Sequence, residues 1–331
     1  PFGKSKDALN PMDMIDPASI DAPDQCNRLA RMMNTNRFES DPFWEDISQT
    51  VLSGTLLFLA THIPRAERSM ALLHRMWGVS DHLEEMLACM EACELHGGAM
   101  AAASRAYTSA PDKTAGSILT TLKNNISFLT SPRSQAGLSG GWGLLKRIRE
   151  GAPMTIYLRV PPHLLSSHGQ LLRLWLGTIL TTVAQRAERP EIPDLFLVDE
   201  AATLGYLDEL LTAASLLRGY GLRTWTFWQS IGQIESIYGP RASEILDNAG
   251  TLSMFGAANA ASANNLRALT GFEGPILGMK RSEQVICRQG CEAERAVKLN
   301  YLTDEAYRGR FDPNPFHVRT HPKSRGVEMA A

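Results

Sequence analysis

The chain has 331 residues, of which 44% are hydrophobic and 21% charged, and its formal net charge is −2. This length allows one large domain or two ordinary ones with a buried core, and the composition excludes a disordered chain. The nearly balanced charge argues against a uniformly basic nucleic-acid-binding protein, although it is compatible with a locally basic groove or pore.

The first third of the chain has a mainly helical pattern. Residues 1–23 are rich in Pro, Asp and Ser and predict irregular structure. Asp41 is a good cap for a helix that begins at Pro42, because proline suits the first helical position. Apolar residues then recur at helical spacing from Val51 to Leu59. Further helices are expected over 70–78, 81–93, 97–107 and 114–128.

The pattern changes after a Gly/Ser-rich break at 137–143. Short, dense apolar runs predict buried strands, and helical runs separate them. The strands are expected at 154–160, 194–198, 223–228 and 251–256, and the helices at 168–186 and 207–217. Strands that alternate with helices imply a parallel α/β sheet. Two shorter runs, 285–288 and 296–299, predict a hairpin or two edge strands around Gly290.

Two acidic residues follow the second predicted strand. Asp199 and Glu200 come directly after the apolar run 195–198. Parallel strands deliver their carboxyl ends to the ligand crevice of an open α/β sheet, so Asp199 is placed to orient the water shell of Mg²⁺. Glu200 is placed to polarise the water that attacks a γ-phosphate, as in the Walker B motif. The same pattern alone also fits a plain strand followed by a helix-capping acid.

A polar amide follows the next predicted strand. Gln229 lies one strand–helix–strand unit after the acids, so it is expected at the same sheet edge, where a glutamine senses the γ-phosphate in ring and helicase motors. A glutamine that simply starts a helix is the alternative. The Glu200 and Gln229 side chains are expected within about 10 Å of each other.

Arg218 ends the intervening helix at a glycine-rich turn, and it is expected farther from Glu200, at the opposite edge of the sheet. An arginine there can act as an arginine finger on the nucleotide of a neighbouring subunit. A favourable interaction with the helix dipole also explains a basic residue at this position.

Several segments, in order, resemble the TraG/TraD-type coupling proteins of conjugation and type IV secretion, a family of hexameric P-loop ATPases related to FtsK-like DNA pumps. The matching segments span most of the chain. They are 1–3, 9–13, 41–44, 155–162, 172–174, 199–205, 219–221, 229–230, Gln233, 237–239, Asn248, 299–301 and Phe311.

This resemblance implies a RecA-like P-loop NTPase domain with a mainly parallel α/β sheet, interrupted by an all-α domain. Residues 1–15 would begin the nucleotide-binding domain, and residues 16–135 would form the all-α domain. Residues 136–331 would complete the nucleotide-binding domain with the Walker B acids and the sensor glutamine.

The resemblance also implies cofactors and partners. ATP and Mg²⁺ would be the cofactors, with Asp199, Glu200, Gln229 and Arg218 as the site residues and Asp199 nearest the metal. The expected partners are five more copies of the chain, DNA bound without sequence specificity, the relaxase with its relaxosome, and the secretion channel proteins. The full-length family acts at the cytoplasmic face of the bacterial inner membrane, whereas this chain alone is expected to be soluble and cytoplasmic.

One departure from the family pattern concerns the phosphates. The sequence contains no G-x-x-x-x-G-K-[ST] motif, and Gly3-Lys4-Ser5 imitates only its end. The chain is therefore expected to lack the membrane anchor and the P-loop segment, as a truncated gene product, an incomplete gene call or a protein without nucleotide chemistry. The expected function is delivery of a DNA–relaxase substrate to a secretion channel. The alternatives are a catalytically inactive remnant or binding module, and an FtsK-like translocase unconnected with secretion.

Other features have simpler explanations. Five cysteines are too few and unevenly spaced for a disulfide framework, and Cys89, Cys93, Cys287 and Cys291 are expected to be buried or half-buried thiols rather than zinc ligands. His163 and His168 are expected to be exposed polar residues. The basic cluster Lys146, Arg147 and Arg149 fits a solvated helix face, with DNA phosphate contact as the alternative. The most apolar run, 47–63, contains polar residues and predicts a buried or half-buried helix rather than a membrane span.

Overall fold

The computed structural model describes residues 7–34, 42–78, 80–141 and 143–312. The chain divides into two compact units, Pro1–Asn248 and Ala249–Ala331. The expected domain limits near residues 15 and 135 stay predictions.

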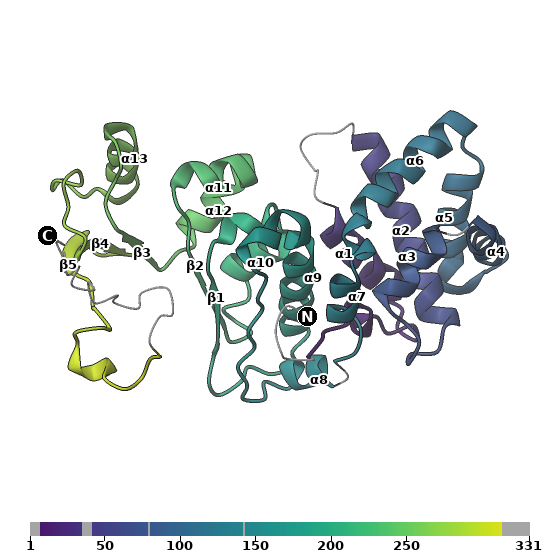
Figure 1. Cartoon of the computed structure of the whole chain (residues 1–331), viewed down its shortest axis with the longest axis horizontal. Helices are drawn as coiled ribbons and strands as arrows, with labels where there is room; N and C mark the ends of the chain where they lie inside the picture. Colours follow the sequence, from purple (N-terminus) through teal and green to yellow (C-terminus); the bar gives the residue numbers. More distant parts are fainter. Residues whose placement is uncertain (1–6, 35–41, 79, 142, 313–331) are drawn as a thin grey trace, which may run out of the picture. The chain divides into compact units, whose positions relative to one another are not determined.

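The first part of the larger unit is built from helices (Figure 1). The predicted helices at 70–78, 81–93, 97–107 and 114–128 are confirmed to within a few residues, and the one predicted after Asp41 begins at Pro42. Asp41 itself lies outside the described residues. In chain order the helices are η1 (Pro11–Met14), α1 (Ala22–Met33), α2 (Pro42–His62), α3 (Met70–Gly78), α4 (Ser80–Glu91), η2 (Leu95–Gly98), α5 (Ala99–Thr108), α6 (Asp112–Asn125), η3 (Ser127–Thr130), α7 (Pro132–Gly137) and α8 (Leu144–Arg149).

Helix α2 is the centre of this helical part and packs against α1, α5 and α6. Its Val51, Leu56 and Leu59 side chains are fully buried. Helix α5 approaches α2 closely at Gly54, where an added Cβ would lie 2.2 Å from the Ala103 Cβ. The predicted buried helix over 47–63 is therefore confirmed, and no helix of the described residues is both long and apolar enough to cross a membrane.

Helix α9 (Leu165–Ala184), which follows η4 (Pro162–Leu164), connects the helical part to the sheet. It packs against α1 on one side and against α10 (Asp208–Ser215) on another. Leu171 and Leu174 of α9 belong to the same buried cluster as residues of α2 and as Leu222 at the start of β2. One hydrophobic core therefore continues from the helices to the sheet within this unit.

Strands β1 (Asp194–Val198) and β2 (Leu222–Thr226) form a two-stranded parallel sheet, with Asp194 opposite Leu222 and Val198 opposite Thr226. Both strands were predicted. Phe196 and Val198 pack against the core. Leu195, Leu197 and Trp225 alternate with the inward residues and are 58%, 56% and 53% exposed. Within the described residues of the larger unit, only one face of this sheet is thus covered.

The helices that follow β2 form a small satellite of the core. Helix α11 (Ile231–Tyr238), η6 (Gly239–Arg241) and α12 (Ala242–Asp247) come in sequence order. Their buried side chains cluster around Leu211 of α10. This packing fixes where α11 begins, immediately after the segment that carries Gln229.

The strand expected at 154–160 is wrong. Residues 152–160 contain no assigned strand. Met154 and Leu158 pack partly against the core, whereas Tyr157 is 81% exposed. The apolar run marks a segment that touches the core, but a strand also needs a neighbouring backbone to bond with, and no described strand pairs with it.

The smaller unit holds β3 (Thr251–Met254), α13 (Ala260–Thr270), β4 (Glu283–Arg288), β5 (Glu294–Val297) and η7 (Glu305–Tyr307). The three strands form an antiparallel sheet in the order β3-β4-β5. The predicted hairpin around Gly290 is confirmed. The expectation that 251–256 continues the parallel sheet is wrong, because Thr251 pairs with Arg288 and Met254 with Val285 in antiparallel register.

Candidate functional site

The acids and the glutamine leave the same edge of the parallel sheet. The ladder continues past Thr226, because the Phe227 N–H donates to the Val198 carbonyl (3.0 Å) and the Ala201 N–H donates to the Phe227 carbonyl (3.0 Å). The Gln229 side-chain Nε2 donates to Glu200 Oε2 at 3.1 Å. The structure therefore brings Glu200 and Gln229 into direct contact, although 29 residues separate them.

The Glu200 backbone has an unusual conformation. Its φ of 53° and ψ of 54° lie in the left-handed region, and His96 is the other non-glycine residue with positive φ in the described ranges. The Thr203 N–H and hydroxyl both donate to the Glu200 carbonyl, at 2.9 and 2.8 Å. Such a conformation costs a non-glycine residue about 1–2 kcal/mol and is concentrated at functional sites.

Gln229 is held by the start of α11. Ser230 is the N-cap, and its hydroxyl accepts a hydrogen bond from the Gln233 N–H at 3.3 Å. The Gln233 side-chain Oε1 accepts from the Gln229 backbone N–H at 2.8 Å. Sequence reasoning gave Gln233 no role, although Ser followed three residues later by Gln is the signature of a capping box. This cap fixes the backbone from which the Gln229 side chain reaches Glu200.

Asp199 has an exposed side chain that makes no hydrogen bond or ion pair with the rest of the described chain. No group of three or more metal-ligating side chains occurs among the described residues. Mg²⁺ commonly takes only one or two protein carboxylates and completes its shell with waters and substrate phosphates. Asp199 therefore fits a Mg²⁺ ion that arrives with a nucleotide, and it does not fit a metal held by protein alone.

Arg218 lies apart from these residues. It is exposed in the turns between α10 and β2, before the amino end of β2, whereas Gln229 follows the carboxyl end. The five residues of β2 span about 17 Å. The described fold therefore separates Arg218 from the Glu200–Gln229 pair, and the roles of all four residues stay predictions. Gly3-Lys4-Ser5 lies outside the described residues.

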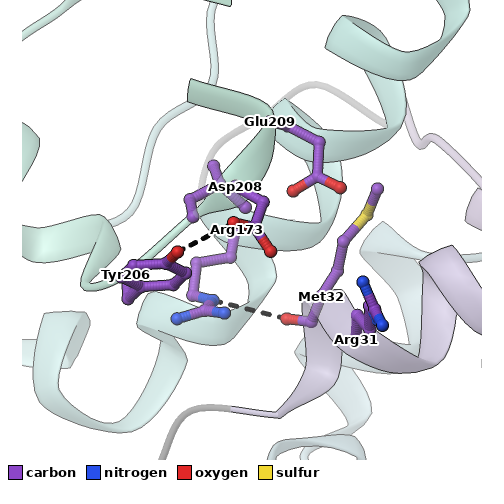
Figure 2. A pocket seen from close by; sticks show the side chains of 7 residues that line it. Arg31, Met32, Arg173, Tyr206, Asp208 and Glu209 are labelled. Carbon is purple, nitrogen blue, oxygen red and sulfur yellow. Dashed lines mark hydrogen bonds between the residues drawn. The ribbon is translucent and has the colours of Figure 1, made fainter. Parts of the chain in front are cut away.

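A small pocket lies close to residues 199–205, which are called the acidic loop because they begin with Asp199 and Glu200 (Figure 2). The Tyr206 hydroxyl donates to Asp208 Oδ1 at 2.8 Å on one side of it. Burial raises the pKa of the Glu209 carboxyl, and the nearby Arg28 and Arg173 oppose that rise. The lining residues are Arg31, Met32, Arg173, Tyr206, Leu207, Asp208 and Glu209.

The expectations for three histidine and cysteine residues need correction. His163 is exposed as expected, but His168 is only 9% exposed, because its ring lies between the hydroxyls of Ser167 (2.8 Å) and Ser131 (3.1 Å). Cys89 and Cys291 are exposed rather than buried or half-buried. In the folded chain Cys89 lies on the solvent side of α4. The residues around it in the sequence did not show which side of this helix would be packed.

The basic cluster on α8 lies in solvent. Lys146 is 77% exposed in its side chain and pairs with Glu150 at 3.7 Å. The Arg149 guanidinium donates to the Gln185 side chain at 2.8 Å. A solvated helix face is therefore sufficient to explain this cluster.

Comparison with known proteins identifies the family. Residues 2–273 match the family described as "Type IV secretory system Conjugative DNA transfer". The match covers more than half of the chain. The chain belongs to this conjugative DNA transfer family.

Individual relatives match over shorter stretches. The chain is 29% identical over 150 residues to the probable conjugal transfer protein TraG of Sinorhizobium fredii, which covers 45% of this chain and 23% of that protein. It is 36% identical over 86 residues to the TraG protein of Rhizobium radiobacter, and this match covers 26% of this chain and 13% of that protein. It is 26% identical over 133 residues to the type IV secretion system-coupling protein VirD4 of Bartonella quintana, which covers 40% and 21%. The chain spans less than a quarter of the length of these relatives.

Solved structures of the bacterial conjugative coupling protein TrwB share the fold. The unbound form matches with a TM-score of 0.68 and 16% identity, covering 90% of this chain and 74% of that one. The form in complex with ADP and Mg²⁺ matches with a TM-score of 0.68 and 17% identity, covering 89% and 74%. The likeness confirms the predicted α/β, RecA-like fold class of this conjugative family member.

Proposed function

We propose that this chain is part of a type IV secretion coupling protein, an ATP-driven motor that delivers DNA with its bound relaxase to the secretion channel. Membership of the conjugative DNA transfer family supports the biological setting. The single observation that supports hydrolysis is the contact between Glu200 and Gln229 at the carboxyl edge of a parallel sheet. Edges of this kind are where α/β proteins bind nucleotides.

Each site residue has a distinct proposed task. Asp199 holds a water of the Mg²⁺ shell, and the ion neutralises charge on the phosphates when it is bound. Glu200 accepts the hydrogen bond of the attacking water and orients it. Gln229 donates to Glu200 and so links the position of that carboxylate to the start of α11. Arg218, which precedes the amino end of β2, acts on the nucleotide of a neighbouring copy.

The proposed partners follow from the same function. They are further copies of the chain in a hexameric ring, DNA bound through its phosphates, the relaxase complex and the channel proteins at the inner membrane. Phosphate contacts carry no sequence information and release counterions. DNA affinity is therefore expected to be independent of sequence and to fall steeply between about 50 and 200 mM salt.

A second candidate function is a binding module without turnover. The observation that favours it is the absence of a G-x-x-x-x-G-K-[ST] motif from the printed sequence. Backbone amides and a lysine of that loop hold the nucleotide phosphates. Purified residues 1–331 are therefore expected to show no ATP turnover above background, and steady turnover that Glu200→Gln abolishes would contradict this expectation.

The test of the proposed function is a mating assay with the gene in its donor strain. Glu200→Gln is expected to lower DNA transfer by about a hundredfold or more, because a group that orients the attacking water contributes that much. Glu235→Gln is the matched control, since Glu235 is an exposed residue of α11 and the substitution makes the same change of charge. Equal transfer by both variants would overturn the assignment of Glu200.

A further inference from the structure

Arg173 is a buried arginine in the middle of α9, and it joins three segments. The residue is 5% exposed. Nε donates to the Met32 carbonyl at 3.3 Å, Nη2 to the Asn34 carbonyl at 3.0 Å, and Nη1 to the Leu204 carbonyl at 3.2 Å. Figure 2 shows the guanidinium directed at the carbonyl of Met32. Arg173 thus bonds the backbone in three places through one planar group, a task that suits arginine and not lysine.

Two of these carbonyls belong to the end of α1. Met32 lies in its last turn and Asn34 is its C-cap. The last carbonyls of a helix have no partner within the helix and carry the negative end of its dipole, so a cation there is favourable. Arg173 therefore caps α1, the first α-helix of the helical part.

The third carbonyl belongs to the acidic loop. Leu204 ends the short helix η5 (Ala201–Leu204), which begins directly after Glu200, and its side chain is buried. The next residue, Gly205, has φ 61° and ψ −155°, a conformation essentially restricted to glycine. A Cβ at Gly205 would lie 3.4 Å from Arg173 Nη1. Both ends of the loop thus adopt backbone conformations that are unfavourable for ordinary residues, and such a loop keeps its shape only where its surroundings hold it.

Hydrogen bonds from outside reach the loop backbone at three places, and one of them is a long bond of 3.5 Å from the Tyr238 hydroxyl to the Gly205 carbonyl. The ladder bond from the Ala201 N–H to the Phe227 carbonyl holds the end next to Glu200. The bond from Arg173 to the Leu204 carbonyl holds the far end. Without the guanidinium, the buried Leu204 loses the donor to its carbonyl, and the loss of a charged donor to a buried carbonyl favours local rearrangement.

We propose that Arg173 is a positioning residue for Glu200. By holding Leu204 against the end of α1, it keeps the loop compact, the Glu200 backbone left-handed and the Glu200 carboxylate on Gln229. The proposal rests on the proposed function only in assigning Glu200 a role in hydrolysis. The effect of Arg173 on the contact between Glu200 and Gln229 is tested without nucleotide. A negative result there is therefore distinguishable from a failure of the ATPase assignment.

Arg186 provides a matched control. It lies two residues after the end of α9 and is 6% exposed. Its guanidinium also donates to backbone carbonyls, those of Ile148 and Tyr220, and it pairs with Asp194. Asp194 is the first residue of β1. Arg186 is therefore the same kind of buried arginine acting at the amino end of β1, away from Glu200.

The experiment compares backbone hydrogen exchange in the full chain and in Arg173→Met and Arg186→Met. Arg173→Met is expected to accelerate exchange of the Thr203 and Gly205 amides by about tenfold or more, the effect of losing one net hydrogen bond to a charged group. It is also expected to shift the Gln229 side-chain amide resonances toward those of Glu200→Gln. Arg186→Met should leave both measurements unchanged while it accelerates exchange near Asp194.

The opposite results would overturn the proposal. Equal acceleration of the loop amides by Arg173→Met and Arg186→Met would show that Arg173 contributes only general packing. Unshifted Gln229 side-chain amide resonances in Arg173→Met would show that Arg173 does not influence the contact between Gln229 and Glu200. If Arg173→Met does not fold, Arg173→Lys carries the same comparison. Lysine keeps the charge but lacks the planar guanidinium with its several donors, so the loop amides are expected to be less protected from exchange than with arginine. Full protection of the loop amides with lysine would also overturn the proposal.

Discussion

Helix α2 and strand β1 are both apolar, but the chain buries them differently. The Val51, Leu56 and Leu59 side chains of α2 are fully buried among other helices. The Leu195 and Leu197 side chains of β1 are more than half exposed, on a face that the described residues of the larger unit do not cover. Parallel sheets are usually covered on both faces. Helix α2 is therefore enclosed by other helices, whereas the sheet that carries the acids is packed on one face.

This difference indicates what holds the candidate site in place. Glu200 and Gln229 sit at the edge of a half-covered sheet, so burial of the sheet alone does not fix them. Individual hydrogen bonds hold these residues in place instead. They are the Gln229–Glu200 bond, the bond of Gln233 at the start of α11, and the bond from Arg173 to the acidic loop. Substitutions in the helical part should change global stability, and those at the edge should mainly change local order.

The largest expected contrast is between two leucine truncations. Leu56→Ala removes a fully buried side chain of α2 and should lower the free energy of unfolding by about 2–5 kcal/mol. Leu197→Ala removes a side chain that is 56% exposed and should lower it by less than about 1 kcal/mol. Urea denaturation of both purified variants measures the difference. Equal losses would show that the exposed face of β1 is covered in solution.

The close approach of α2 and α5 gives a second contrast, this time in sign. Gly54→Ala places a Cβ 2.2 Å from the Ala103 Cβ, so the helices must move apart at a cost of about 1–3 kcal/mol. Gly116→Ala in α6 meets no atom within 4 Å and should stabilise by about 0.5–1 kcal/mol, because alanine favours a helix more than glycine does. Thermal unfolding of the two variants should move the midpoint in opposite directions. A stabilised Gly54→Ala would show that the two helices are not closely packed.

The smallest expected effect concerns backbone strain at the edge. Glu200→Gly should stabilise the fold by about 1 kcal/mol, because glycine adopts the left-handed conformation without the cost that glutamate bears. Glu235→Gly in α11 should destabilise it by a similar amount, since glycine is unfavourable within a helix. Denaturation midpoints of both variants test the pair. A destabilised Glu200→Gly would mean that the Glu200 side-chain contacts outweigh the strain.

Sequence reasoning found most local elements and the central pair of the candidate site. The apolar run at 194–198 matches β1 in both bounds, and the capping pattern placed the start of α2 at Pro42. The contact of Glu200 with Gln229 followed from the rule that parallel neighbouring strands end at one edge. These inferences depend on residues close in sequence, or on one topological rule.

Other features were decided by partners distant in sequence. An apolar run at 154–160 has strand character, but no described strand bonds to it, and β3 pairs with a hairpin that lies about 30 residues later in antiparallel register. The burial of His168 depends on Ser131, and the contacts of Arg173 depend on Met32, Asn34 and Leu204.

The sequence by itself determined most helix and strand segments and the order of motifs that resembles coupling proteins, and it predicted the chemistry that is proposed for Asp199 and Glu200. Short-range hydrogen bonding and apolar spacing are encoded within a few residues, so they can be read directly. Only the tertiary structure decided that Arg173 joins α1 to the acidic loop, across 31 and 141 residues of chain. A side chain in the middle of a helix selects its acceptors by packing, and packing depends on every segment that surrounds it.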